Sequence, residues 1–177
     1  MNTRPLLPQG AELVHPPTRK KVYISLLLAF SFTLLPWMEQ IRWLVPDFTL
    51  MALLYWNIRS PRIASLSAAF SLGLLTDVAR GVVFGLNALA YCIATFIVLL
   101  LQRRLEGFDV PRQSLQLSPI LIGKEMLVLA LGLAMGRGDA DWRWLAAGIV
   151  AALLWPLFAW LVDRLTSQAP ATRQTPL

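Results

Sequence analysis

Hydrophobic residues follow one another in long unbroken runs along this chain, and short polar stretches separate the runs. Six apolar segments cover residues 22–38, 44–58, 63–79, 82–101, 115–135 and 144–162. Lipid offers the backbone no hydrogen-bond partner, so such runs predict transmembrane helices, whereas the strands of a β-barrel would alternate apolar and polar residues. The pattern predicts an all-α, polytopic membrane protein with six transmembrane helices in residues 22–162. Mobile cytoplasmic tails are expected at residues 1–21 and 163–177.

The second apolar segment is the shortest, and the distribution of charge decides whether it crosses. Its 15 residues reach only about 22 Å as a helix, against a hydrocarbon core of about 30 Å. With six crossings and a cytoplasmic N-terminus, 11 Lys and Arg lie inside and 4 outside; without this crossing the counts become 7 and 8. The positive-inside rule therefore favours six membrane crossings, with both termini cytoplasmic.

The composition agrees with a chain that lies in lipid. Apolar residues make up 56% and charged residues 15%, whereas soluble domains carry about 45 to 50% and about 25%. A water-soluble globular enzyme and a disordered chain are excluded. The net charge of +6 falls in short clusters between apolar segments, which indicates membrane orientation and no nucleic-acid surface.

Few residues are suited to catalysis. The single histidine, His15, lies in the N-terminal tail, and the single cysteine, Cys92, lies inside an apolar segment. This excludes catalytic triads, Cys-His pairs and histidine metal sites. Asp77 is the one carboxylate suitably placed near a helix end, so an intramembrane aspartyl pair is also absent. The sequence predicts no enzyme, no metal site and no cofactor.

Lys124 and Glu125 interrupt the fifth apolar segment near its middle. Each costs about 2.5 to 3.5 kcal/mol at the bilayer centre, and neighbours on a helix point about 100° apart, so we expect them not to neutralise each other. Two interpretations stay open: a relay or docking site, or a structural arrangement in which Lys124 snorkels to the interface. We expect Glu125 to point into the bundle, toward Arg80, Thr33 or Thr95.

Small residues and one turn suggest close helix packing. Asp77 and Arg80 lie three positions apart before Gly81, where they could form a local ion pair, either a turn clasp or part of a site. Three pairs have the spacing that lets helix backbones approach closely, namely Gly81 with Gly85, Gly132 with Gly136, and Ala69 with Gly73. Pro156 is expected to kink the last helix.

The most specific pattern in the chain begins in the second apolar segment. It reads Pro46-Asp47-Phe48-Thr49-Leu50-Met51-Ala52-Leu53-Leu54-Tyr55-Trp56, then Gly73-Leu74-Leu75-Thr76-Asp77, Gly81, Gly85-Leu86-Asn87-Ala88-Leu89 with Tyr91, and later Leu154-Trp155-Pro156. Pro46 and Asp47 suit a helix N-terminus, and Tyr55 and Trp56 are expected at the opposite membrane interface. The pattern resembles the rod-shape-determining protein MreD family, over essentially the whole chain.

The resemblance implies a non-enzymatic scaffold of the bacterial cell-elongation (rod) complex, located in the inner (cytoplasmic) membrane. Such a scaffold would act with MreC and, through it, with MreB filaments, RodA and a class B penicillin-binding protein, to maintain cell shape and lateral peptidoglycan synthesis. It also implies a fold similar to the substrate-binding subunits of energy-coupling-factor transporters, so a subunit that binds a small, vitamin-like molecule is the alternative. We expect the second to fourth helices, including Tyr55, Trp56, Gly73 and Gly85, to bind MreC.

Overall fold

The computed structural model describes residues 18–136 and 141–166. In these residues the chain forms α1 (Arg19–Thr33), α2 (Glu39–Arg42), α3 (Phe48–Arg59), α4 (Leu66–Arg80), α5 (Leu86–Glu106), α6 (Val110–Ala134), the short 3₁₀ helix η1 (Trp142–Trp144) and α7 (Leu145–Thr166). The described ranges contain no strand, which confirms the all-α prediction for them. Helix α1 begins before residue 22 and α7 ends after residue 162, so the helices include parts of both expected tails. Residues 1–17, with His15, and residues 167–177 lie outside the described residues.

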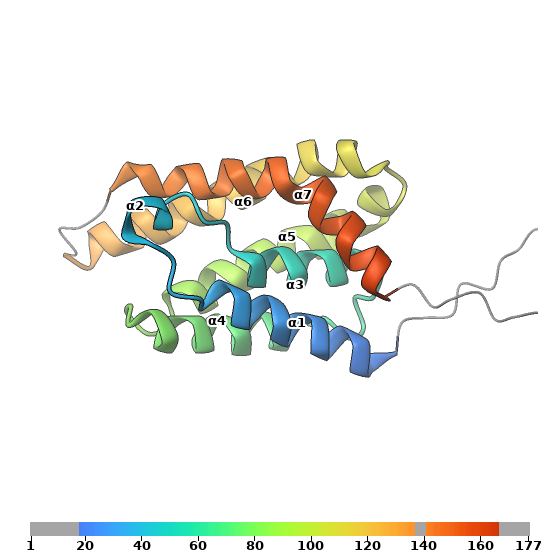
Figure 1. Cartoon of the computed structure of the whole chain (residues 1–177), viewed down its shortest axis with the longest axis horizontal. Coiled ribbons are helices and arrows are strands. Elements are labelled where there is room, and N and C mark those ends of the chain that lie inside the picture. The colour runs from blue at the N-terminus through green and yellow to red at the C-terminus, as the bar shows by residue number, and fades with distance from the viewer. Residues whose placement is uncertain (1–17, 137–140, 167–177) are drawn as a thin grey trace, which may run out of the picture.

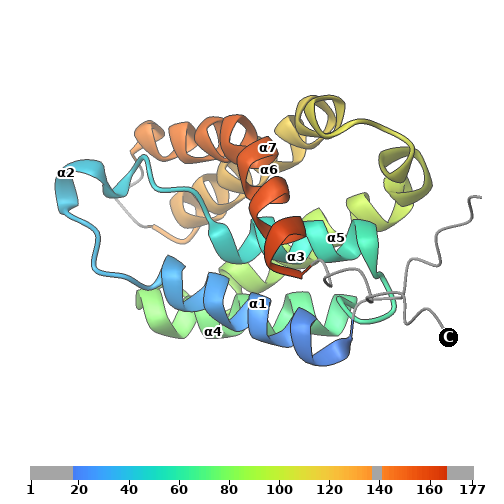
Figure 2. The same cartoon turned by 45° about the vertical axis from the view of Figure 1, so that its right-hand side comes forward.

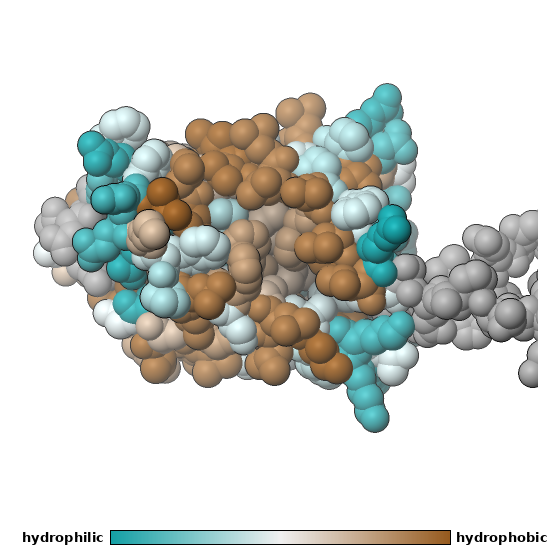
Figure 3. Space-filling model, viewed as in Figure 1, coloured by the Kyte–Doolittle hydropathy of each residue, from teal (hydrophilic) through white to brown (hydrophobic). Residues whose placement is uncertain are grey.

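The six longer helices run up and down in a single bundle (Figures 1 and 2). The starts of α1, α4 and α6 and the ends of α3, α5 and α7 lie at one end of this bundle, while α2 and the α4–α5 turn lie at the other. On the face shown in Figure 3, an apolar belt separates hydrophilic residues at the two ends. Helices α5 and α6 and the stretch Trp142–Thr166 are each long and apolar enough to cross a membrane. Six crossings therefore remain a prediction, and the up-and-down arrangement of the six longer helices is compatible with it.

The second apolar segment differs from the single helix expected from residue 44. Residues 43–47 run without regular structure from α2 into the bundle, and α3 begins only at Phe48 (Figure 1). The residue before a proline is biased away from helix, which explains why the helix starts after Pro46. Pro46 and Asp47 are buried, and protein surroundings of this kind permit irregular backbone at membrane depth.

Other helix boundaries follow the prolines as well. Helix α1 ends at Thr33 instead of residue 38, close to Pro36. Helix α6 begins at Val110, earlier than the expected residue 115, and carries a proline in its first turn, where no backbone donor is lost. Helix α7 continues through Pro156 and bends visibly in its second half (Figures 1 and 2), as the sequence predicts.

The core is built around α3, whose residues from Thr49 to Ile58 are all buried. Helices α1, α5 and α7 pack against it. Close approach of helix backbones occurs at two glycines: a Cβ on Gly73 would lie 2.4 Å from the Ala88 Cα, and one on Gly148 would lie 2.9 Å from the Ile122 Cα. The predicted close packing is confirmed at Gly73, and Ala69 is buried, whereas Gly148 was not anticipated.

The other two small-residue pairs do not mediate helix packing. Gly81, Gly85 and Gly136 have φ angles of +61°, +95° and +77°, in the left-handed region that favours glycine. They end or start helices in turns. A Cβ on Gly132 would meet nothing within 4 Å. For these four glycines the expected helix packing is wrong, because spacing alone does not distinguish a helix face from a turn.

Candidate functional site: a buried charge cluster

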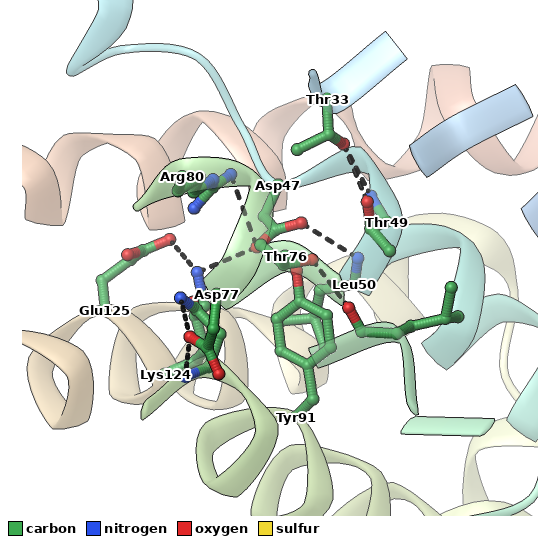
Figure 4. Close-up of polar contacts among 12 residues, drawn as sticks. Thr33, Asp47, Thr49, Leu50, Thr76, Asp77, Arg80, Tyr91, Lys124 and Glu125 are labelled. Atoms are coloured by element: carbon green, nitrogen blue, oxygen red, sulfur yellow. Dashed lines mark hydrogen bonds and ion pairs between the residues drawn. The ribbon is translucent and has the colours of Figure 1, made fainter. Parts of the chain in front are cut away.

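A cluster of charged and hydroxyl groups lies inside the bundle around the carboxylate of Asp47 (Figure 4). We call it the buried charge cluster; its members are Asp47, Arg80, Tyr91, Lys124 and Glu125. They come from the N-terminus of α3, the end of α4, the second turn of α5 and the middle of α6. The side chains of Lys124 and Asp47 are only 1% and 4% exposed, so the cluster is closed to lipid at its centre.

Asp47 is the common acceptor of the cluster. Its Oδ2 accepts a hydrogen bond from the Tyr91 hydroxyl at 2.6 Å and one from the Lys124 ammonium at 3.0 Å. The Arg80 guanidinium lies 3.9 Å from the same oxygen. Lys124 also lies over the Tyr91 ring, 5.8 Å from its centre. With Glu125 included, two carboxylates balance two cations, and this neutrality is what makes burial of the charges tolerable.

Asp47 also completes the N-terminus of α3. Its Oδ1 accepts from the Leu50 amide at 3.1 Å, and the Thr33 hydroxyl accepts from the Thr49 amide at 3.1 Å. The first amides of a helix have no partner inside it, and lipid supplies none. A helix that begins within the bundle therefore needs such side chains, which confirms the expected place of Asp47 and gives Thr33 a role in capping α3.

Lys124 and Glu125 behave differently from the expectation. Their charged groups lie 3.0 Å apart, so neighbours in sequence do form an ion pair, because long side chains can bend toward a shared space. Lys124 does not snorkel: it is the more buried of the two, held by Asp47. Glu125 points inward as predicted, its side chain 11% exposed, but its partner is Lys124 instead of Arg80, Thr33 or Thr95.

Asp77 does not form the expected ion pair with Arg80. Its carboxylate accepts hydrogen bonds from the amides of Gly85 at 2.9 Å and Asn87 at 2.8 Å, and from the Asn87 side chain at 2.9 Å. These groups open α5, so Asp77 caps the following helix, while Arg80 turns to Asp47. A carboxylate directed at a helix N-terminus is also favoured by the helix dipole.

The side chains of Tyr55 and Trp56 face other helices of the bundle. They are 4% and 2% exposed. The Tyr55 hydroxyl donates to Asp163 on α7, and the Trp56 indole donates to the Ser25 hydroxyl on α1 at 2.7 Å. Arg59 pairs with the same Asp163 at 3.2 Å. Asp163 was missed by sequence reasoning, although a carboxylate near the end of a strongly apolar helix is a signal for such a bond.

The residues expected to bind MreC thus take up internal positions for the most part. Tyr55, Trp56 and Gly73 are buried, and Gly85 is half-buried in the α4–α5 turn. Binding through this face stays a prediction, but it requires exposed neighbours. The same hairpin carries outward apolar side chains, which include Phe70, Leu75, Val78, Phe84 and Phe96.

The buried charge cluster is better suited to holding helices together than to catalysis. Each charged group has an opposite charge within 4.0 Å, and none has a free approach for a substrate at the buried centre. Among residues 18–136 and 141–166, no three His, Cys, Asp or Glu side chains come together as a metal site. Together, the apolar belt and the internal polar contacts define a helical membrane protein stabilised by buried hydrogen bonds and ion pairs.

Comparison with known proteins identifies the family. A family model described as rod shape-determining protein MreD matches residues 19–165. A protein of Haemophilus influenzae (strain ATCC 51907 / DSM 11121 / KW20 / Rd), named "Rod shape-determining protein MreD", is 25% identical over 130 residues, which are 73% of this chain and 80% of the relative. The chain belongs to the MreD family, whose members determine rod shape. No solved structure matches the chain, so the likeness to energy-coupling-factor subunits stays a prediction.

Proposed function

We propose that this protein is a non-enzymatic scaffold of the rod complex in the bacterial inner membrane, with six crossings and both termini in the cytoplasm. It acts with MreC and, through it, with MreB, RodA and a class B penicillin-binding protein to direct lateral peptidoglycan synthesis. Membership of the MreD family is the observation that carries this proposal.

The buried charge cluster supports a scaffold over a transport subunit. Asp47, Lys124 and Glu125 satisfy one another inside the bundle, so these charges are already paired without a bound molecule. Buried ion pairs add little net stability, but they can fix which helices meet and in what register. In this chain they join α3, α4 and α6, which gives partner helices a rigid surface.

The partner surface that we propose is the outward face of the α4–α5 hairpin. Phe84 is 67% exposed in the turn, and Leu75 is 52% exposed on α4. Gly73 and Gly85 act indirectly, because one lets the two helices approach and the other allows the turn. Aromatic and aliphatic side chains of this kind supply the van der Waals contacts on which association inside lipid depends.

The test is depletion of the protein in its native host, complemented by variants, with cell shape and co-purified MreC as readouts. Rounded, lysis-prone cells on depletion support the scaffold; normal rods with a nutrient requirement support the transport alternative. Phe84→Ala and Leu75→Ala should keep the yield of folded protein and reduce the amount of MreC recovered. Leu115→Ala, at an exposed position of α6, is the matched control. Unchanged recovery of MreC with the hairpin variants would place the partner elsewhere.

A further inference from the structure

A groove opens on the surface between α1 and α4, away from the buried charge cluster. These helices start at the same end of the bundle and lie alongside each other (Figures 1 and 2), yet α1 packs on α3 and α4 packs on α5. The groove has a volume of about 520 Å³, within the size range of small-molecule sites. Its apolar lining includes Tyr23, Ile24, Leu27, Ile63, Ala68 and Leu72.

The groove covers only part of the length of the two helices. On α1 it covers the first turns, and on α4 it ends at Leu72, about 9 Å along the helix axis from the first residue, Leu66. A transmembrane helix of a partner protein crosses both halves of the membrane and would need a longer contact surface. A lipid acyl chain reaches from the interface to the bilayer centre, so the length of the groove fits an acyl chain better.

Cations without partners surround the interfacial end of the groove. Arg19 and Lys20 precede Tyr23 and Ile24 by one helical turn on the same face of α1, and Arg62 directly precedes Ile63. The side chains of these three cations are exposed and form no hydrogen bond or ion pair with other described residues. Other cations at this end do have partners: Lys21 donates to the Thr166 carbonyl at 3.1 Å.

Two hydroxyl groups line the groove within five positions of Arg62 along the chain. Ser65 and Ser67 both line it, and their hydroxyl oxygens are 2.6 Å apart. A phospholipid places its ester and glycerol oxygens at this level, below the phosphate and above the chains. We propose that the groove binds one anionic phospholipid of the cytoplasmic leaflet, with a chain along Ile24 and Ala68 and the phosphate near Lys20 and Arg62. This assignment rests on the cytoplasmic termini of the proposed function.

The experiment measures lipid retained by the full-length protein. The protein is purified in a delipidating detergent, supplied with phosphatidylglycerol or phosphatidylcholine, and examined by native mass spectrometry. We expect one phosphatidylglycerol to be retained in preference to phosphatidylcholine. Lys20→Gln with Arg62→Gln should lower the affinity about 30-fold, since each basic residue near an anionic surface contributes about 1 kcal/mol. Arg103→Gln with Arg112→Gln removes equal charge at the same end and should change little.

A second pair of variants tests the groove itself. Ser71 lines it and is exposed, so Ser71→Phe should fill the groove without disturbing the core and should abolish retention. Ala79→Phe adds the same ring at an exposed position of α4 outside the groove and should retain lipid. Equal retention of both lipids, or retention by Ser71→Phe, would overturn the proposal. Because native mass spectrometry uses purified protein, a negative result would refute lipid binding without affecting the cell-shape test of the proposed function.

Discussion

The ammonium group of Lys124 lies 3.0 Å from the carboxylate of Asp47, although 77 positions separate the two residues in the chain. This contact joins the middle of α6 to the N-terminus of α3 inside the bundle. Removing one member of a buried ion pair leaves the other charge without a partner, whereas removing both is often nearly neutral. The stability of the chain should therefore depend on the two residues in a strongly non-additive way.

Lys124→Met and Asp47→Asn are each expected to lower the free energy of unfolding by about 3 to 5 kcal/mol. Asparagine still caps a helix, so the second variant removes mainly the charge. The double variant should lose clearly less than the sum of the two. Unfolding in detergent, followed by circular dichroism, measures all three, with Arg112→Met as an exposed control. Additive losses would show that the two side chains are not coupled.

Glu125 should contribute less to stability than Lys124. Its one close partner is Lys124, and Lys124 still pairs with Asp47 when Glu125 is removed. Glu125→Gln retains shape and hydrogen bonding and is expected to keep the stability of the unmodified protein. Glu125→Leu should lower the free energy of unfolding by about 1 to 3 kcal/mol, the cost of a buried donor left without its acceptor. Unchanged yield, thermal stability and cell shape with leucine would leave Glu125 without a structural or functional role.

Gly73→Ala is expected to reduce the yield of folded protein sharply. The added Cβ would lie 2.4 Å from the Cα of Ala88, and backbone atoms cannot move aside as a flexible side chain does. Gly132→Ala is the matched control, since its Cβ meets nothing within 4 Å and alanine favours a helix by about 1 kcal/mol. Size-exclusion profiles and melting temperatures distinguish the two. Equal behaviour of both variants would contradict the close approach of α4 and α5.

The sequence was sufficient to predict the helical class, the position of Asp47 at a helix N-terminus, and the need for Glu125 to point inward. These predictions use local rules: apolar length, helix-end preferences and the cost of a charge in lipid. The partners were not predictable, because they depend on how separate helices meet. Asp47 meets Lys124 only because residues 43–47 enter the bundle without helical structure.

The rule for neighbouring residues on a helix also failed for a physical reason. It describes the directions of the Cβ atoms, whereas the ends of Lys124 and Glu125 are several bonds away and converge on one polar space. Tyr55 shows the opposite case: an aromatic residue near a helix end suits the interface by composition, yet Asp163 on α7 draws its hydroxyl inward. In each case a contact between distant segments of the chain determines where the side chain points.

Asp77→Ala should destabilise the α4–α5 hairpin, because the first amides of α5 lose their acceptor inside the protein. We expect a loss of about 1 to 3 kcal/mol. Asp109→Ala is the control, since Asp109 directly precedes α6 but its side chain caps no amide of that helix. Hydrogen exchange at Gly85 and Asn87 reports the effect directly. Unchanged protection of these amides would rule out capping by Asp77.

The crossing made by α3 is the decisive part of the topology, because its 12 residues reach only about 18 Å and residues 43–47 must complete the path. Reporter fusions after Arg62, after Arg104 and at the C-terminus should report the cytoplasm, and fusions near Arg42 and Asp139 the periplasm. Arg42 and Arg62 flank α3, so their two fusions test this crossing alone. If both report one side, or if the C-terminus is periplasmic, the chain does not cross six times. Opposite signals would mean that a short, buried helix and an irregular segment that enters the bundle together span the membrane.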